Sequence, residues 1–286
     1  MKALLIGVDG QLGTDLKRTC PDDVSLTGLT QDDLDITHQA SVLSIIKEQA
    51  PDLIINTAAY TRVDDAEENV DLAMNVNAIG VKHVSIAAQL CGARLVHIST
   101  DYVFDGGKVS KKEPYFEDDC PAPINTYGIS KYAGELFAQS YCQRHYIVRL
   151  ASLYGKAGAM GKGGNFVYTM LKLAKERKTV NVVNDIFMSP TYALDAAGMI
   201  WDIALSDREY GIYHVVNSGI CSWYEFASEI ISAVGLRASI LPVSSSEFPT
   251  KARRPVWSPL ASKKGITMRP WQEAVRDFLG DSLRGD

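Results

Sequence analysis

The sequence predicts an α/β fold, with a Rossmann-like, doubly wound parallel sheet and a smaller α/β lobe beside it. Three observations predict this arrangement. Short apolar runs typical of buried strands alternate with helical patterns over residues 1–150, as right-handed βαβ units require. A glycine turn follows the first of these strands and opens a helix. After residue 150 the pattern changes, because the stretch Gly155 to Gly164 holds five glycines and indicates a loop.

The composition is that of an ordinary globular protein of 286 residues, 46% of them hydrophobic. The formal net charge of −5 argues against a nucleic-acid partner, whose binding surface would be basic. The five cysteines are odd in number and lack metal-ligand spacing, so we interpret them as free thiols in a reducing cytosol. The first apolar run, Ala3 to Ile6, is too short for a signal peptide or a membrane span. We therefore expect a cytoplasmic protein with no membrane partner.

The first strand is predicted over Lys2 to Ile6, and G-x-x-G-x-x-G follows it at the start of a helix. This spacing differs by one position from the G-x-G-x-x-G dinucleotide fingerprint. Its physics is the same, because a tight turn brings the backbone and a helix N-terminus close to a pyrophosphate. The alternative is a structural turn whose glycines serve packing. The predicted cofactor residues of this turn are Gly7, Gly10, Gln11, Leu12 and Gly13.

The second strand is predicted over Val24 to Leu29. In a dinucleotide fold the next position carries an acidic residue that binds the adenosine ribose, or an arginine that accepts a 2′-phosphate. Here it carries Thr30 with no basic residue adjacent, so the sequence does not choose between NADH and NADPH. Asp35 and Ile36 either lie against the adenine, or Asp35 caps the helix predicted from about Gln39 to Gln49.

A third buried strand, Asp52 to Thr57, leads into the run Ala58 to Tyr60. Small residues at the end of a strand let a flat cofactor approach the backbone, although they equally serve helix packing. The helix predicted over Val70 to Cys91 contains Asn77, a poor helix former whose side chain can bond a distorted turn. We assign to the cofactor site Ala58, Ala59, Tyr60 and Asn77.

The next apolar run ends in Ser99 and Thr100, and a helix is predicted around Tyr127 and Lys131. The last two residues are four apart and share one face of that helix. A phenol titrates near ~10 when unperturbed, and a neighbouring cation favours the phenolate, so we expect Lys131 to lower the pKa of Tyr127. The Thr100 hydroxyl would hydrogen-bond a carbonyl oxygen beside the pair. The predicted catalytic residues are Thr100, Tyr127 and Lys131, and the cofactor site gains Ser99, Tyr127 and Lys131.

These candidates share one position in the predicted fold. The glycine turn, the run Ala58 to Tyr60 and the run Ser99 to Asp101 all follow strands. Tyr-x-x-x-Lys is a common pattern on its own. Because the carboxyl ends of parallel strands meet at one edge of the sheet, the candidates are expected to form a single site, and this convergence favours a chemical role.

The second half of the chain supplies further strands and helices. We predict a strand over Tyr146 to Leu150, helices over Phe166 to Lys175 and Tyr192 to Leu205, a strand over Thr179 to Val183, a helix from the capping box at Ser222 and a last helix ending near Leu279. We assign residues 1–150 and about 178–205 to a dinucleotide-binding domain. The substrate-binding lobe is expected over about 151–177 and 206–286.

Several motifs go beyond a general nucleotide fold. They are the glycine turn, Ser99-Thr100-Asp101-Tyr102-Val103-Phe104, Tyr127-x-x-x-Lys131, Asn56 to Thr61, Val63-Asp64-x-Ala66-Glu67, Asp185 to Thr191 and Ala252-Arg253-Arg254-Pro255. Together they resemble the extended short-chain dehydrogenase/reductase superfamily and, more narrowly, the dTDP-4-dehydrorhamnose reductase family. The resemblance extends from Met1 to about Leu279.

The resemblance implies a reaction and a set of roles. Nicotinamide would deliver hydride to the C4 ketone of dTDP-4-dehydro-L-rhamnose, giving dTDP-L-rhamnose. Tyr127 would protonate the oxygen, Thr100 would hydrogen-bond it, and Lys131 would also hold the nicotinamide ribose. Arg253 and Arg254 would face the diphosphate. The implied substrate residues are Thr100, Asp101, Tyr102, Phe104, Asn165, Arg253 and Arg254.

One position departs from the family pattern. Where the family often carries Ser-Trp-x-Tyr, this chain reads Ala151-Ser152-Leu153-Tyr154, which removes a large apolar face from the sugar site. Two alternatives stay open: a reductase or epimerase of a different nucleotide sugar, and a non-catalytic subunit resembling the regulatory partner of methionine adenosyltransferase. Some family members dimerise through a carboxylate-bound metal. Asp15 could contribute a ligand, but the sequence offers no full matching set, so we predict no metal. We expect a monomer or a homodimer.

Overall fold

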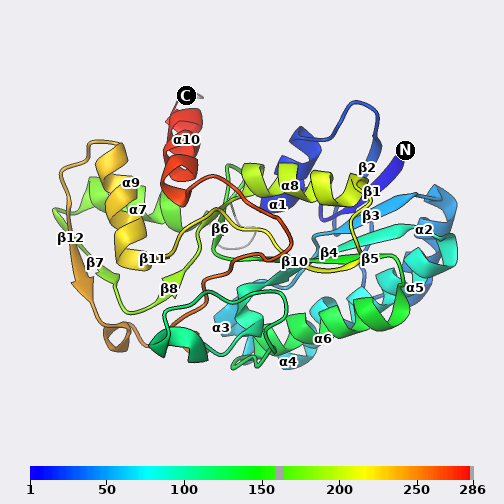
Figure 1. Cartoon of the computed structure of the whole chain (residues 1–286), viewed down its shortest axis with the longest axis horizontal. Helices are drawn as coiled ribbons and strands as arrows, with labels where there is room; N and C mark the ends of the chain where they lie inside the picture. The colour runs from blue at the N-terminus through cyan, green and yellow to red at the C-terminus, as the bar shows by residue number, and fades with distance from the viewer. Residues whose placement is uncertain (159–163, 284–286) are drawn as a thin grey trace.

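A six-stranded sheet forms the centre of the fold (Figure 1). In the computed structural model, which describes residues 1–158 and 164–283, every neighbouring pair of its strands is parallel. The order is β10 (Gly211–His214), β5 (His145–Leu150), β4 (Arg94–Thr100), β3 (Leu53–Asn56), β1 (Lys2–Ile6) and β2 (Ser25–Leu29). The strand order reverses at β1, and in open α/β sheets a ligand crevice forms at this point, outside the carboxyl ends of the strands.

Helices cover both faces of this sheet, which confirms the predicted doubly wound fold. Helices α1 (Gln11–Arg18) and α8 (Ala193–Leu205) lie on one face, and α2 (Gln39–Gln49), α5 (Val81–Cys91) and α6 (Thr126–Tyr141) lie on the other. Residues along a strand alternate between the two layers, so Leu5 packs under α1 and α8 whereas Leu4 packs under α2 and α5. The strands form unbroken apolar runs because both of their faces are buried.

The segment between β3 and α5 is irregular. A short helix, α3 (Val63–Ala66), is followed by α4 (Val70–Met74), and α4 continues into a π-helical stretch, Asn75–Gly80, before α5 begins. The predicted helix over Val70 to Cys91 therefore carries the distortion expected around Asn77. Such π turns are frequent at functional sites. Two 3₁₀ turns, Asp101–Val103 and Gly107–Ser110, follow β4.

The smaller lobe has its own apolar core, around which α7 (Phe166–Glu176), α9 (Trp223–Ala233) and α10 (Trp271–Leu283) pack. Its short strands pair as β7 (Thr179–Val183) with β12 (Ser239–Val243), β8 (Phe187–Met188) with β11 (Cys221–Ser222), and β6 (Leu153–Tyr154) with β9 (Thr191–Tyr192). A 3₁₀ turn, Ser245–Glu247, follows β12. Of the loop predicted between residues 155 and 164, residues 159–163 lie outside the described residues.

Four strands lie elsewhere than the sequence indicates. Strands β7, β8 and β9, which fall in the range assigned with the dinucleotide-binding domain, pair with β12, β11 and β6 in the smaller lobe. Strand β10, which we assigned to the substrate-binding lobe, pairs with β5 as an edge strand of the large sheet. These differences have one cause, because the pairing partner of a short strand is decided by tertiary context and leaves no local signal.

The glycine turn between β1 and α1 needs glycine at two positions for different reasons. Gly7 has φ +82°, a left-handed conformation that other residues rarely adopt. At Gly13 the constraint is space, since a Cβ there would lie 2.1 Å from the Gly7 carbonyl oxygen and 2.9 Å from the Val8 backbone. The first turn of α1 therefore lies directly against the turn that follows β1.

Replacing Gly13 by alanine should destabilise the protein by about 1–3 kcal/mol, because the added methyl group overlaps backbone atoms rather than a flexible side chain. The matched control is Gly198→Ala in α8, where an added Cβ would meet nothing within 4 Å. That change should stabilise the helix by about 0.5–1 kcal/mol. Denaturant unfolding measures both effects, and a Gly13→Ala protein as stable as its parent would contradict the close packing.

Candidate active site

The turn between β1 and α1 fits a dinucleotide. Gly10 caps α1 without a side-chain hydrogen bond, and the first turn of this helix has no acidic residue. The amides of that turn are thus available to an anion, which the helix dipole also favours. The Gly10 amide donates to the Gly7 carbonyl oxygen at 3.1 Å and closes the turn. On neighbouring β3, the buried Asn56 has a side-chain Nδ2 without a hydrogen-bond partner.

Two residues that we assigned to different ligands contact each other beside this turn. Gln11 Nε2 donates to the Leu153 carbonyl oxygen at 2.9 Å, and Gln11 Oε1 accepts from Asn165 Nδ2 at 3.4 Å. Asn165 also caps α7, because its side chain accepts from the Tyr168 amide at 3.1 Å. The Leu12 side chain lies in the core, which leaves its backbone to face a ligand. A substrate contact of Asn165 stays a prediction.

The adenosine end of the predicted site is shaped by local turns after β2. The Thr30 hydroxyl and amide both donate to Asp33, at 2.8 and 2.9 Å. Asp35 accepts from Thr37 two residues on, at 2.9 Å from its amide, and α2 begins without a side-chain cap. The alternative in which Asp35 caps α2 is therefore wrong. The Ile36 side chain is 3% exposed and packs in the core under α2 and α5.

Asn77 holds the run that follows β3. Its Oδ1 accepts from the Tyr60 amide at 2.8 Å, and its Nδ2 donates to the Tyr60 carbonyl oxygen at 3.0 Å. The same Nδ2 donates to Ser130 Oγ on α6 at 3.0 Å. Because Asn77 is fully buried, it acts by fixing the backbone of Ala58 to Tyr60 and by joining that run to α6.

Thr100 and Tyr127 come together as the sequence predicts. Thr100 ends β4, where its hydroxyl donates to Asp101 Oδ1 at 3.1 Å and accepts from the Tyr102 amide at 3.2 Å. The Tyr127 phenol lies close enough to Thr100 for the threonine hydroxyl to influence its pKa. Tyr127 lies in the first turn of α6, which Asn125 caps by accepting from the Gly128 amide at 2.7 Å. The cap sets where α6 begins and hence where the phenol lies.

The electrostatics of Tyr127 and Lys131 differ from the expectation that the lysine lowers the pKa of the phenol. Burial raises the pKa of Tyr127 above its ordinary value, and the nearby Thr100 hydroxyl only partly opposes this. The Lys131 ammonium is engaged elsewhere, because Nζ donates to the Ile98 carbonyl oxygen at 2.6 Å. Burial lowers the pKa of Lys131 to about 8, against the opposing effect of the Glu135 carboxylate. The expected lowering of the Tyr127 pKa is therefore wrong for this structure, since desolvation is the larger effect.

A buried ion pair joins Glu135 on α6 to Arg149 on β5, and sequence reasoning missed it. Glu135 accepts from Arg149 Nε at 2.8 Å and from Nη2 at 2.6 Å, and both side chains are at most 1% exposed. Glu135 Oε1 also accepts from Ser99 Oγ at 2.5 Å. The spacing places Glu135 four residues after Lys131 and so on the same face of α6, but it does not indicate the partner, Arg149.

Asp101 and Tyr102, the residues that follow Thr100, lie close to Tyr127. Burial raises the pKa of Asp101 to about 6, although hydrogen bonds with Ser258 and Thr100 oppose the rise. The rings of Tyr102 and Tyr127 meet edge to face, with centroids 5.7 Å apart. Asp101 and Tyr102 therefore lie beside Thr100 and Tyr127, and a substrate contact of either residue stays a prediction.

The remaining predicted substrate residues divide into a core residue and two arginines. Phe104 has no exposed surface and stacks on Tyr115, so it can support the wall of a pocket but cannot touch a ligand in this conformation. Arg253 is exposed, and Arg254 Nη2 donates to Asp64 Oδ2 at 2.7 Å. The Arg254 guanidinium lies 6.0 Å from the centre of the Tyr102 ring, so this side chain lies next to the residues that follow Thr100.

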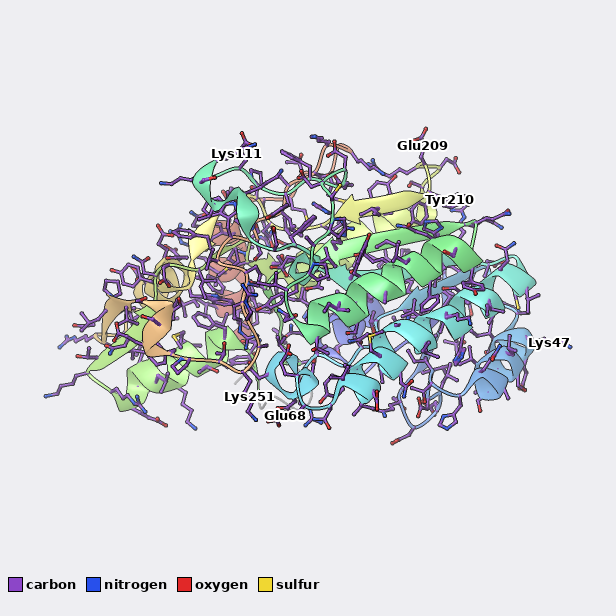
Figure 2. The ribbon with its side chains drawn as sticks, turned by 90° about the horizontal axis from the view of Figure 1, so that it is seen from below. Lys47, Glu68, Lys111, Glu209, Tyr210 and Lys251 are labelled. Carbon is purple, nitrogen blue, oxygen red and sulfur yellow. The ribbon has the colours of Figure 1, made fainter. Side chains whose placement is uncertain are left out.

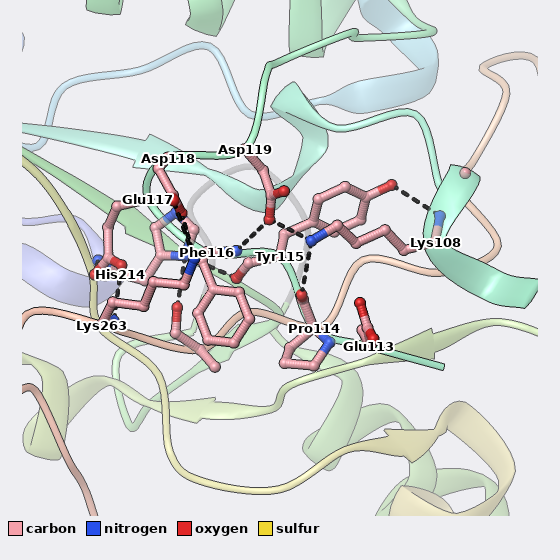
Figure 3. Close-up of polar contacts among 12 residues, drawn as sticks. Lys108, Glu113, Pro114, Tyr115, Phe116, Glu117, Asp118, Asp119, His214 and Lys263 are labelled. Carbon is pink, nitrogen blue, oxygen red and sulfur yellow. Dashed lines mark hydrogen bonds and ion pairs between the residues drawn. The ribbon is translucent and has the colours of Figure 1, made fainter. Parts of the chain in front are cut away.

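The loop over residues 105–119 is held in place by polar contacts (Figure 3). Lys108 Nζ donates to Asp119 at 2.5 Å, and Lys263 Nζ donates to Asp118 at 3.0 Å. The backbone amide of His214 on β10 donates to Glu117 at 3.1 Å. These contacts tie the loop to the large sheet and to the segment that follows the arginines.

Ser152, where the family pattern has tryptophan, adopts a constrained backbone. Its φ is +44°, which is uncommon for a residue other than glycine. Its carbonyl oxygen accepts from the Thr191 amide at 3.3 Å, in the short β6–β9 pair. Strained conformations of this kind tend to cluster at functional sites.

The described residues contain neither a metal-binding cluster of side chains nor a helix that could span a membrane. Among residues 1–158 and 164–283, no group of three or more His, Cys, Asp or Glu is arranged to hold a metal ion. Asp15, the candidate metal ligand, instead lies 3.7 Å from Arg18 Nε. Across the same residues, none of the helices combines the length and apolar character of a membrane span.

The fold and the site together define the class of protein: a Rossmann-type oxidoreductase that uses a nicotinamide cofactor. A family model described as the RmlD substrate binding domain matches residues 1–284. The chain belongs to this family, which confirms the resemblance in its motifs.

Relatives cover the chain from end to end. The spore coat polysaccharide biosynthesis protein SpsK of Bacillus subtilis is 40% identical over 97% of this chain and 96% of its own. The dTDP-4-dehydrorhamnose reductase of Escherichia coli is 35% identical over 98% of both chains. The solved dTDP-4-dehydrorhamnose reductase of Bacillus anthracis, in complex with NADP, superimposes with a TM-score of 0.92 at 42% identity, over 98% of this chain and 99% of its own.

The Glu135–Arg149 pair generates a stability prediction. Glu135→Gln leaves the Arg149 charge buried and uncompensated, which should cost about 3–5 kcal/mol and lower the melting temperature by roughly 6–10 °C. The matched control is Glu68→Gln, which breaks an exposed pair with Lys251 and should cost about 0–1 kcal/mol. Equal melting temperatures for the two variants would show that the buried pair is not the stronger interaction.

Proposed function

We propose that the chain reduces the C4 ketone of dTDP-4-dehydro-L-rhamnose to give dTDP-L-rhamnose, with NADPH or NADH as cofactor. The observation that carries the proposal is the placement of Tyr127, in the first turn of α6, beside Thr100 at the carboxyl end of β4. The glycine turn lies at the same edge of the sheet. Whole-length identity of 35% to a dTDP-4-dehydrorhamnose reductase supports the same substrate class.

The chain's own residues have distinct parts in this reaction. The bound nicotinamide supplies the hydride. Tyr127 donates a proton to the ketone oxygen as negative charge develops there, and Thr100 holds that oxygen by a hydrogen bond. Lys131 holds the nicotinamide ribose and adds positive charge near the phenol. The glycine turn takes the pyrophosphate, and the arginine segment takes the diphosphate of the sugar nucleotide.

The same proposal includes the cellular compartment, the oligomeric state and the partner of the chain. All five cysteines are free thiols, which supports the cytoplasm as the compartment. The working unit is a monomer or a homodimer, and its partner is the nucleotide sugar. Ser152, together with the 40% identity to SpsK, supports a different nucleotide 4-keto sugar as the second candidate substrate.

Tyr127→Phe should lower kcat by about 10²–10⁴ because it removes the proton donor and leaves the ring in place. The dissociation constant of NADPH, measured by fluorescence titration, should stay within about twofold of the parent value. Tyr141→Phe at the exposed far end of α6 is the matched control and should retain full turnover. Turnover of Tyr127→Phe within a few-fold of the parent would refute the assignment.

The substrate itself is tested by following nicotinamide absorbance with a panel of nucleotide 4-keto sugars and both cofactors. We expect oxidation of the cofactor with dTDP-4-dehydro-L-rhamnose at a kcat/KM at least about tenfold above that for the other sugars. Preference for another 4-keto sugar would show that the substrate assignment is wrong and that the assigned type of reaction is right. Absence of oxidation with every sugar, alongside tight binding to a partner enzyme, would favour the non-catalytic alternative.

A further inference from the structure

The motif Val63-Asp64-x-Ala66-Glu67 has no role in the mechanism so far, yet its two carboxylates make long-range contacts. Both lie at the short helix α3, three residues apart, and both are half-buried. Asp64 contacts the arginine segment more than 180 residues away in the sequence, and Glu67 contacts the start of α6. A four-residue helix thus touches both ends of the proposed substrate site.

Asp64 fixes the arginine segment in two ways. Its Oδ1 accepts from the Ala252 amide at 3.0 Å, and its Oδ2 accepts from Arg254 Nη2 at 2.7 Å. The other terminal nitrogen, Arg254 Nη1, is buried and has no hydrogen-bond partner. A buried donor of this kind carries a desolvation cost until an acceptor arrives, and a diphosphate oxygen is such an acceptor.

Glu67 fixes the beginning of α6. Its Oε1 accepts from the Thr126 amide at 2.9 Å, and its Oε2 accepts from the Thr126 hydroxyl at 3.0 Å. Thr126 immediately precedes Tyr127. Asn125 joins the two ends, because its Oδ1 caps α6 while its Nδ2 donates to the Arg253 carbonyl oxygen at 2.8 Å. The arginine segment and the first turn of α6 are therefore parts of one hydrogen-bonded unit.

We propose that Asp64 and Glu67 are positioning residues. Together they set the distance between Arg254, which faces the anionic end of the substrate, and Tyr127, which faces its ketone. Asp64 orients Arg254 toward the diphosphate, and Glu67 holds Tyr127 at the ketone oxygen. This inference rests on the proposed function. The geometry carries it, because the two carboxylates lie three residues apart at α3 and neither contacts Thr100, Tyr127 or Lys131 through the side-chain hydrogen bonds described.

The test separates the two roles by binding and turnover. Asp64→Asn should weaken binding of dTDP, measured by calorimetry without turnover, by about tenfold, and raise KM in proportion with kcat nearly unchanged. If Asp64 only neutralised Arg254, the same variant would bind dTDP more tightly, and the proposal for Asp64 would be overturned.

Glu67→Ala should lower kcat by about 10- to 100-fold and leave dTDP binding within about twofold of the parent value. Glu67→Gln keeps one acceptor for Thr126 and should recover part of kcat, which distinguishes positioning from a general loss of folding. An unchanged kcat in Glu67→Ala, or equal losses in the alanine and glutamine variants, would overturn the role of Glu67.

The control is Glu68→Ala, since Glu68 is next in sequence but forms an exposed pair with Lys251 at 2.5 Å (Figure 2). Its kcat, KM and dTDP binding should match those of the parent. Turnover of the parent enzyme tests the proposed function. The effect of Asp64→Asn on dTDP binding is measured without turnover, so it tests the role of Asp64 even if another nucleotide sugar is the substrate.

Discussion

The site depends on the close packing of α6 against the end of β4 and against the π-helical stretch Asn75–Gly80. A Cβ at Gly128 would lie 2.2 Å from the Tyr102 carbonyl oxygen, and a Cβ at Gly134 would lie 2.2 Å from the Asn77 carbonyl oxygen. Only glycine allows this contact at either position. It brings the face of α6 that carries Tyr127 and Lys131 against the strand ends, where Thr100 meets the phenol and the ammonium reaches a strand carbonyl.

Such a close contact also buries charge, and the fold compensates for it within a few ångströms. Lys131 and Glu135 both face the sheet and are at most 2% exposed. Arg149 on β5 neutralises Glu135 by a bidentate hydrogen bond, and Glu135 in turn holds Ser99. A buried ion pair is weak evidence for net stability, but losing one partner is costly. The pair therefore fixes the relative position of α6, β4 and β5.

The sequence predicted those parts of the structure that have a local signal. The glycine turn, the alternation of strands and helices, and the distortion around Asn77 all follow from residue types at short spacing. The contacts of Asp64 with Arg254 and of Glu135 with Arg149 join distant segments, and no local pattern reports them. The same limit explains why β7 and β10 lie in other sheets than expected. The helix-cap alternative for Asp35 is wrong for a different reason, because a turn with Thr37 competes with helix capping for its carboxylate.

The raised pKa of Tyr127 is compatible with its proposed role as an acid. A proton donor must be protonated before the chemical step, and burial secures this at neutral pH. The step itself is most efficient when the donor's pKa lies near the working pH, so positive charge must approach the phenol as the ligands bind. Lys131 can supply it, since with a pKa of about 8 it is mostly cationic at pH 7. Its bond to the Ile98 carbonyl oxygen holds that charge at the sheet edge.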